Sequence, residues 1–297
     1  MSLLATFAIA ASLGAMPPQE ADLGQEPTRV EDVEVTAQMR SELVRQQVES
    51  FIEHNIEPPK GRPLARWNKP VCIATAYLNQ QYAQAVIDSI AARIIEFGGD
   101  VDGPGCKANL MVVGTTNGSA TAKDLVRNDR DGFTPAMNST NLSTRQLRKF
   151  ENGDEAVRWW HVSMPIMIEG GEIAVRLKGD DFHTVNVTDG SRLRTNTRDD
   201  LMRVVIVVDF SKTSHIPVTS LIDYISFVGM TQVAPGYEAT SFDSILNLFN
   251  DPQNVTGLTQ WDRDYLSALY IAPPNRPSID AQVRDITTQV LMEREGR

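Results

Sequence analysis

The stretch that decides the fold of this chain runs from Arg203 to Tyr270. It begins with Arg203-Val-Val-Ile-Val-Val-Asp209, whose run of β-branched residues predicts a buried strand. The apolar segment from Val218 to Gly229 predicts a helix that ends at its glycine. Ser244-Ile-Leu-Asn247 predicts a tight turn, and a final helix is expected from Leu258 to Tyr270. The predicted order is therefore strand, helix, turn, helix.

The final helix has a recognisable beginning. Thr259 precedes Gln-Trp-Asp262, so its hydroxyl can accept from the first turn while Asp262 bonds back to the backbone of Thr259. This capping box fixes the start of the helix near residue 259.

The Arg203–Tyr270 stretch resembles the second half of a metzincin, a class of zinc proteases. In these enzymes two histidines four residues apart on a helix bind zinc, and a glutamate beside the first activates water. A glycine then ends the helix, and a third histidine follows. The turn at Ser244–Asn247 is similar to the metzincin turn beneath the metal, and the Leu-Thr-x-Trp-Asp and Leu-Tyr motifs resemble the last metzincin helix. Uncharacterised families of secreted proteobacterial proteins have similar endings. A strand–helix–turn–helix order also arises in unrelated α/β proteins, and this alternative stays open.

The zinc ligands themselves are missing from the matching positions. With Gly229 as the turn glycine, Ile222 stands for the first histidine, Asp223 for the glutamate, Ser226 for the second histidine and Gln232 for the third. Zinc needs nitrogen, thiolate or carboxylate donors at about 2 Å, which isoleucine and serine do not supply. The resemblance thus implies a metzincin-like fold with no metal or other cofactor. It also implies a cleft along the Val218–Gly229 helix, lined by the three polar residues.

The preceding half of the chain alternates predicted strands and helices. The predicted strands are Val71–Tyr77, Leu110–Gly114 and Trp159–Met167, with weaker ones at Ile173–Leu177 and Phe182–Val187; the predicted helices are Gln80–Phe97 and Ser119–Asn128. This alternation predicts an α/β (α+β) fold, a mixed sheet with packed helices.

The Trp159–Met167 segment has two distinguishing features. Pro165 cannot donate to a sheet, so we expect an edge or solvent-facing strand. Trp159 and Trp160 are adjacent and should face opposite ways, one into the core and one outward near His161 as a contact for a partner or ligand.

Composition and the N-terminal residues predict where in the cell the protein is located. Residues 1–15 are apolar and too short to cross a bilayer, which predicts a signal peptide; a buried N-terminal helix is the alternative. The mature protein should be soluble, without a membrane span, and periplasmic or secreted in a bacterium. The net charge of −10 argues against nucleic acid as a partner. Cys72 and Cys106 are the two cysteines, and export predicts a disulfide between them, whereas buried free thiols are expected otherwise.

The expected organisation divides the chain into four parts. A signal peptide at 1–15 precedes an acidic tail and N-terminal helix at 16–60. A metzincin-like domain occupies 61–275 and a C-terminal helix 276–297. Within the tail, Val33–Ala37 resembles a TonB box, the segment that energy-coupling proteins grip in outer-membrane receptors; a plain linker or first strand is the competing interpretation.

Histidines offer the remaining candidate chemistry. His54, His161, His183 and His215 show no pair at the spacing of helical metal ligands, and a structural role is expected for each. Asp180 and Asp181 precede His183, but adjacent residues in a strand diverge, so a solvated turn is expected there.

Three functions follow from these patterns. The first is a non-enzymatic envelope protein that binds a peptide or protein in a cleft above Asp223, Ser226 and Gln232. The second is a hydrolase or peptidase-like enzyme that uses Asp223 with His215 or His161. The third is an adaptor that engages a TonB-like coupler through Val33–Ala37.

Overall fold

The computed structural model describes residues 37–137, 140–181, 194–235 and 241–296. The chain divides into two units, Met1–Thr36 and Ala37–Arg297, and the described helices and strands belong to the second unit. The predicted signal peptide, the TonB-box-like residues up to position 36, the predicted strand at Phe182–Val187 and His183 lie outside the described residues.

A mixed sheet forms the centre of the fold. Its strands are β1 (Ile73–Ala76), β2 (Leu110–Thr115), β3 (Val157–Met167) and β4 (Thr197–Asp209), in the order β1-β2-β4-β3. The first two strands and β4 are parallel, and β3 runs antiparallel to β4 with a bulge between Val162 and Ser163. The predicted mixed α/β fold with packed helices is confirmed.

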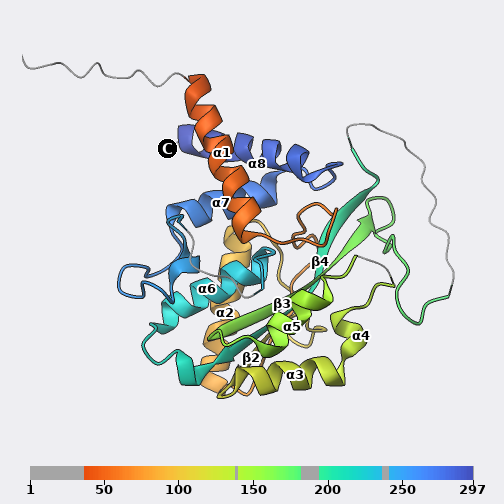
Figure 1. Ribbon diagram of the computed structural model, residues 1–297, viewed down its shortest axis with the longest axis vertical. Coiled ribbons are helices and arrows are strands. Elements are labelled where there is room, and N and C mark those ends of the chain that lie inside the picture. Colours follow the sequence, from red (N-terminus) through yellow and green to blue (C-terminus); the bar gives the residue numbers. More distant parts are fainter. Residues whose placement is uncertain (1–36, 138–139, 182–193, 236–240, 297) are drawn as a thin grey trace, which may run out of the picture. The chain divides into compact units, whose positions relative to one another are not determined.

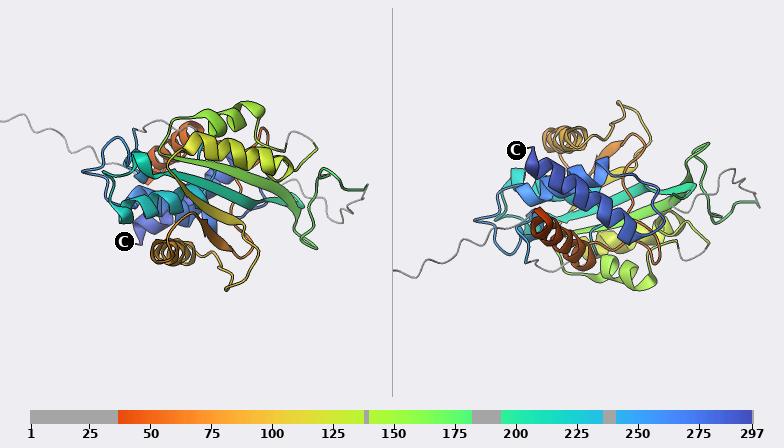
Figure 2. Two further views of the ribbon diagram at one scale, coloured as in Figure 1. Left: turned by 90° about the horizontal axis from the view of Figure 1, so that it is seen from below. Right: turned by 90° about the horizontal axis from the view of Figure 1, so that it is seen from above.

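Helices cover both faces of this sheet. They are α1 (Ala37–Asn55), α2 (Gln80–Glu96), α3 (Gly118–Asn128), α4 (Arg130–Phe133), α5 (Thr144–Asn152), α6 (Val218–Met230), α7 (Gln260–Ile271) and α8 (Ile279–Glu295). Figure 2 shows α3 and α5 on one side of the sheet and α2 and α6 on the other. Figure 1 shows α1 beside α8, and these two helices pack on each other within the same unit as residues 61–275. Among the described residues, no helix is long and apolar enough to span a membrane.

Local sequence signals explain where helices begin and end. The Asn79 side chain accepts a 3.0 Å hydrogen bond from the Tyr82 amide at the start of α2, and Gly98, with φ of 82°, follows its end. Thr259 and Asp262 form the predicted capping box of α7. The short helices α4 and α5 were not predicted from the sequence. A capping box of Ser143 and Gln146 starts α5.

The edge strand differs from its prediction in one respect. Pro165 lies on β3 at the sheet edge, as predicted, but every residue of β3 is buried, so the strand is not solvent-facing. Trp159 and Trp160 are 2% and 1% exposed, and the prediction that one is exposed is wrong. Helices on both faces are the reason: Trp160 lies near Phe133 and Phe150, while Trp159 contacts Tyr224 of α6.

The segment Ile173–Leu177 is not a regular strand. Isolated bridges join Ile173 to Ile166 and Leu177 to Ala136. This stretch therefore pairs with β3 at a single bridge and does not form a regular strand of the sheet.

Cys72 and Cys106 form the predicted disulfide, with an S–S distance of 1.95 Å and a Cα–Cα distance of 5.9 Å. The bond joins the residue before β1 to the loop before β2, a sequence separation of 34. It closes the loop that contains α2.

We expect removal of the disulfide to destabilise the fold. In the chain-entropy account, opening a loop of this length lowers the free energy of unfolding by about 3–4 kcal/mol. Urea denaturation of Cys72→Ala/Cys106→Ala measures the change against the oxidised parent. Equal midpoints and slopes for the two proteins would show that the bond does not constrain the unfolded chain.

Candidate functional site

Helix α6 carries the positions that the metzincin resemblance assigns to metal binding. Its sequence is apolar nearly all round, and every residue from Ser220 to Met230 is buried. The predicted end at Gly229 is one residue early, because α6 continues to Met230. Gly229 serves a close approach instead: a Cβ there would lie 3.1 Å from the Leu110 Cδ1 atom of β2. The helix is therefore packed tightly onto the sheet.

The residues that the resemblance matches to the first two histidines form internal contacts. Ile222 is 8% exposed and belongs to the hydrophobic core. The Ser226 hydroxyl donates a 2.8 Å hydrogen bond to the Ile222 carbonyl of its own helix. Ile222 and Ser226 thus lie one turn apart on the same side of α6, and the Ser226 hydroxyl is bonded to the backbone of Ile222.

Gln232, at the third position, joins three parts of the chain. Its Oε1 accepts a 2.7 Å hydrogen bond from the Ala65 amide, and its Nε2 donates to the Ser163 hydroxyl of β3 at 3.1 Å. Gln232, Ala65 and Ser163 are each 3% exposed or less. Each end of the side-chain amide is therefore used inside the protein.

Asp223, which the resemblance matches to the glutamate, is held by a cation and a backbone amide. Arg93 of α2 donates to its carboxylate through Nε at 2.7 Å and Nη2 at 3.3 Å, and the Leu258 amide donates at 3.2 Å. Gly257 leaves room for this contact, since a Cβ there would lie 2.8 Å from Asp223 Oδ2. Asp223 thus connects α6 with α2 and with the approach to α7.

The carbonyl groups at the end of α6 each receive a donor from a different element. His161 Nε2 lies 2.7 Å from the Val228 carbonyl, Trp67 Nε1 donates to Gly229 at 2.8 Å, and the Tyr270 hydroxyl donates to Met230 at 3.0 Å. These carbonyls have no partner within a helix that ends here, so the donors are required in a buried setting. His161 therefore carries its hydrogen on Nε2.

The chain beyond the helix is bonded in the same way. The Glu57 amide donates to the Gln232 carbonyl at 2.8 Å, and Trp159 Nε1 of β3 donates to the Val233 carbonyl at 2.9 Å. Val233 also forms an antiparallel bridge with Ile56. The end of α6 is consequently enclosed by backbone as well as by side chains.

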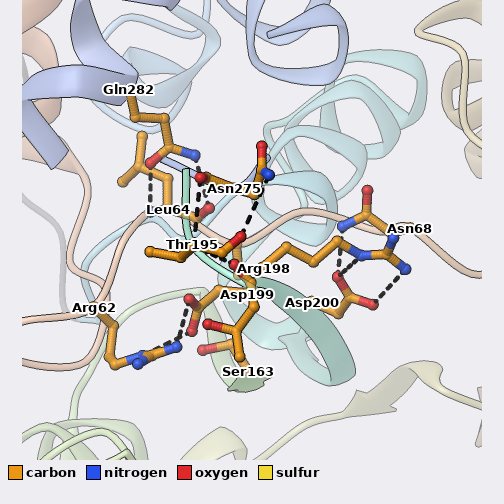
Figure 3. A network of polar contacts seen from close by, with 12 residues as sticks. Arg62, Leu64, Asn68, Ser163, Thr195, Arg198, Asp199, Asp200, Asn275 and Gln282 are labelled. Atoms are coloured by element: carbon orange, nitrogen blue, oxygen red, sulfur yellow. Dashed lines mark hydrogen bonds and ion pairs between the residues drawn. The ribbon is translucent and has the colours of Figure 1, made fainter. Parts of the chain in front are cut away.

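Residues 55–68, which we call the covering segment, lie across this end of α6. Figure 3 shows how polar contacts hold the segment at several points. Arg62 donates to both oxygens of Asp199 at 3.0 and 2.7 Å. Gln282 of α8 forms a pair of hydrogen bonds with the backbone of Leu64, at 2.8 and 3.0 Å. The covering segment is thereby joined to β4 and to the C-terminal helix.

A second arginine of the covering segment caps another helix. Arg66 Nη1 donates to the carbonyls of Leu269 and Ala272 at the end of α7, at 2.6 and 2.9 Å. Asn68 and Arg198 both donate to Asp200, at 2.6 and 2.8 Å. The contacts of residues 62–68 therefore span β4, α6, α7 and α8.

These contacts correct the prediction of a groove lined by Asp223, Ser226 and Gln232. All three residues are buried, and each is engaged inside the protein. Gln232 bonds to the covering segment and β3, Asp223 bonds to α2 and the Leu258 amide, and Ser226 bonds within α6. Sequence reasoning missed Trp67, Arg93 and the covering segment itself. The available signal was the Pro58-Pro59 pair, which predicts an extended chain but does not say what that chain covers.

The described histidines do not form hydrogen bonds with Asp223. His161 is 2% exposed and donates to the Val228 carbonyl, His215 is exposed, and His54 Nδ1 donates to the Ser50 carbonyl at 2.7 Å. In the described ranges no hydrogen bond joins Asp223 to His161 or His215. The same ranges contain no group of three His, Cys, Asp or Glu residues placed to hold a metal ion.

The turn before α7 is organised around a buried carboxyl. Asp262 accepts from the Ser244 hydroxyl at 2.6 Å and from the Ile245 amide at 2.7 Å, and it closes the capping box with Thr259. Burial raises the pKa of Asp262 to about 6, and the hydrogen bonds from Ser244, Ile245 and Thr259 oppose the rise. The Ser244–Asn247 turn is thus joined to α7 through one side chain.

Comparison of this chain with known protein families, with curated proteins and with solved structures finds no match.

Replacing Gln232 with leucine should destabilise the protein. The change leaves the Ala65 amide and the Ser163 hydroxyl buried without their partner, which should lower the free energy of unfolding by roughly 2–4 kcal/mol. Urea denaturation monitored by tryptophan fluorescence measures it. Gln81→Leu, on an exposed position of α2, is the matched control and should change stability little. A Gln232→Leu midpoint equal to that of Gln81→Leu would contradict this role.

The buried His161 should make stability depend on pH. Burial lowers its pKa to about 4, against about 6.5 in the unfolded chain. Because the folded pKa is the lower one, the stabilisation is present above pH 6.5 and is lost as the pH falls toward 4. The full difference is on the order of 3 kcal/mol.

His161→Gln isolates this effect, since the glutamine amide can replace the Nε2 donor without titrating. The advantage of the parent over His161→Gln, measured by urea denaturation, should shrink between pH 6.5 and 4. Burial also raises the pKa of Asp199 to about 6, as it does for Asp262, but both carboxyls remain in the variant and largely cancel in the difference. His54→Gln, at an exposed histidine, serves as control. A constant difference across this range would contradict the assignment.

Proposed function

We propose that this chain is an exported, non-enzymatic binding protein of the bacterial cell envelope, built on a metzincin-like scaffold that has lost its metal site. The observation that carries the proposal is the use of the former ligand positions as structural contacts. Ser226 bonds within its own helix, and Gln232 links Ala65 to Ser163. Gln232 is thus buried and bonded at each end of its side-chain amide, at the position that the resemblance assigns to the third zinc ligand.

The order of elements supports the resemblance on which the proposal depends. The sheet ends in an antiparallel edge strand, β3, beside three parallel strands. Then β4 leads to α6, the turn at Ile245–Asn247 and α7, as the metzincin resemblance implies. Asp262 bonds the turn to the last of these helices.

Export is supported by the chemistry of the chain. A disulfide between Cys72 and Cys106 persists in oxidising compartments and is uncommon in the reducing cytosol. The net charge of −10 favours solubility and disfavours nucleic acid. A binding role then requires a peptide or protein partner at a surface other than α6.

Zinc uptake tests the proposal. Purified protein is incubated with excess zinc chloride, desalted and measured by elemental analysis alongside a peptide-hydrolysis assay. We expect far less than one zinc per chain and no zinc-dependent cleavage, because no donor set replaces the missing histidines. Stoichiometric zinc that survives desalting, with or without cleavage, would contradict the loss of the metal site.

A further inference from the structure

Strand β1 lies at an edge of the sheet, and within the described ranges β2 is the one strand that pairs with it. The Cys72 carbonyl accepts from the Leu110 amide of β2, whereas the Val71 amide and carbonyl bond on the opposite side, to Asp100 and Asp102. Backbone groups alternate in direction along a strand, so Ile73 and Thr75 point away from β2, like Val71. The outer edge of β1 is therefore made by these two residues.

The outward backbone groups of Ile73 and Thr75 have no partner in the part of the chain that the structure describes. The strand also lacks most features that protect sheet edges: Ile73-Ala-Thr-Ala76 contains no charge and no proline, and its register with β2 is regular. Each of the four residues is partly exposed. The edge is short, and it offers its unpaired donors and acceptors to an extended backbone.

A cavity of about 570 Å³ opens at the carboxyl end of β1 and β2. Ligands of sheets with parallel strands commonly bind at this end of the strands. Tyr77 and Phe210 supply aromatic rings to the cavity, and Thr116, Asp124 and Asn128 supply polar groups. The cavity thus begins where the free edge ends.

Tyr77 occupies an unfavourable position for an aromatic residue. Its φ is 60°, in the region that favours glycine, and its side chain is 87% exposed. Neither packing nor backbone preference accounts for a tyrosine here. Strained residues of this kind gather at binding sites, where a side chain is held ready for a ligand.

Phe210 is held over the floor of the cavity by a glycine. A Cβ on Gly114 would lie 2.7 Å from Phe210 Cε2 and 2.9 Å from Leu78 Cδ2, so the site needs glycine to seat the ring. Phe210 nevertheless remains 41% exposed. The two rings therefore present aromatic surface that the fold itself does not bury.

Charge selects the kind of side chain that fits the cavity. Among the described residues that line it, Asp124 is the only charged one, and it also pairs with the exposed Arg127 at 2.7 Å. The whole chain carries a net charge of −10. A carboxylate beside aromatic faces attracts lysine or arginine, through charge and through cation–π contact.

We propose that the free edge of β1 binds an extended peptide segment of a partner protein as an added strand, with a basic side chain of that segment in the cavity between Tyr77, Phe210 and Asp124. Unpaired groups of Ile73 and Thr75 bond to the peptide backbone, which gives affinity with little dependence on sequence. The basic side chain gives selectivity. This inference rests on the proposed binding function and specifies its surface.

The test uses the full chain and an acetylated, amidated hexapeptide, Thr-Val-Lys-Val-Thr-Val, with a Lys-to-Glu version as control. Amide exchange is followed by NMR with and without millimolar peptide. We expect the Ile73 and Thr75 amides to exchange quickly in the free protein and to slow by about tenfold or more with the lysine peptide. The glutamate peptide should protect them less.

Variants separate backbone from side-chain recognition. Thr75→Pro removes an amide that points away from β2 and leaves the hydrogen bonds between β1 and β2 in place, so it should weaken peptide binding about tenfold. Thr75→Ala keeps this amide and should bind the peptide like the parent. Asp124→Asn should remove the preference for lysine over glutamate. Asp88→Asn, on the exposed face of α2, should leave binding unchanged.

The outcomes are distinct. No protection of Ile73 and Thr75 at millimolar peptide overturns the proposal. Slow exchange that appears without peptide and grows with protein concentration also overturns it, and assigns the edge to a second copy of this chain. If Thr75→Pro does not fold, two results still test the proposal. They are the amide exchange of Ile73 and Thr75 in the parent protein, and the preference of Asp124→Asn for the lysine peptide over the glutamate peptide. Zinc uptake is measured separately. A result that contradicts the proposed loss of the metal site can therefore be distinguished from a result that contradicts peptide binding at β1.

Discussion

The buried C-terminal end of α6 is the constraint on which the rest of this structure depends. A helix leaves its last carbonyl groups without internal partners, and burying them unpaired costs on the order of 1–3 kcal/mol each. Here His161, Trp67 and Tyr270 each supply a donor to one of three successive carbonyls. These donors come from β3, from the covering segment and from α7, so the helix end joins three distant parts of the chain.

This constraint also bears on the residues that the proposed metzincin resemblance assigns to a zinc site. Once the covering segment lies over the end of α6, Gln232 must satisfy the Ala65 amide, and a histidine kept for zinc could not present the same pair of donor and acceptor. Asp223 likewise accepts from the Arg93 guanidinium of α2. Helix α6, the turn at Ile245–Asn247 and helix α7 follow one another along the chain, and polar groups between them hold this part of the fold together.

The proposed partner binding uses another surface, at the opposite edge of the sheet. The β3 edge is buried along its whole length, whereas β1 is short and partly exposed, and its outer side pairs with no strand among the residues that the structure describes. The aromatic cavity lies at the carboxyl ends of the parallel strands, away from α6. In this account α6 contributes stability, and the β1 end of the sheet contributes recognition.

Sequence patterns predicted helices and strands more accurately than they predicted what packs against individual residues. Apolar periodicity identified α2, and the Thr259–Asp262 capping box located α7, because both signals are local. With two cysteines only one intramolecular disulfide was available. The exposed tryptophan and the open groove over α6 were wrong for a shared reason. Each depends on what packs against the residue, and Trp159 is covered by α6 while Gln232 is covered by a segment about 170 residues earlier in the chain.

Native-state hydrogen exchange at the Glu57 and Ala65 amides tests the central claim most directly. Both amides donate to Gln232, one to its carbonyl and one to its side chain. If the covering segment is part of the fold, both should exchange only when the whole protein unfolds, with a free energy equal to that of global unfolding. Exchange through a local opening several kcal/mol below that value, with α6 still protected, would show that the segment lifts away from a groove and would contradict this account.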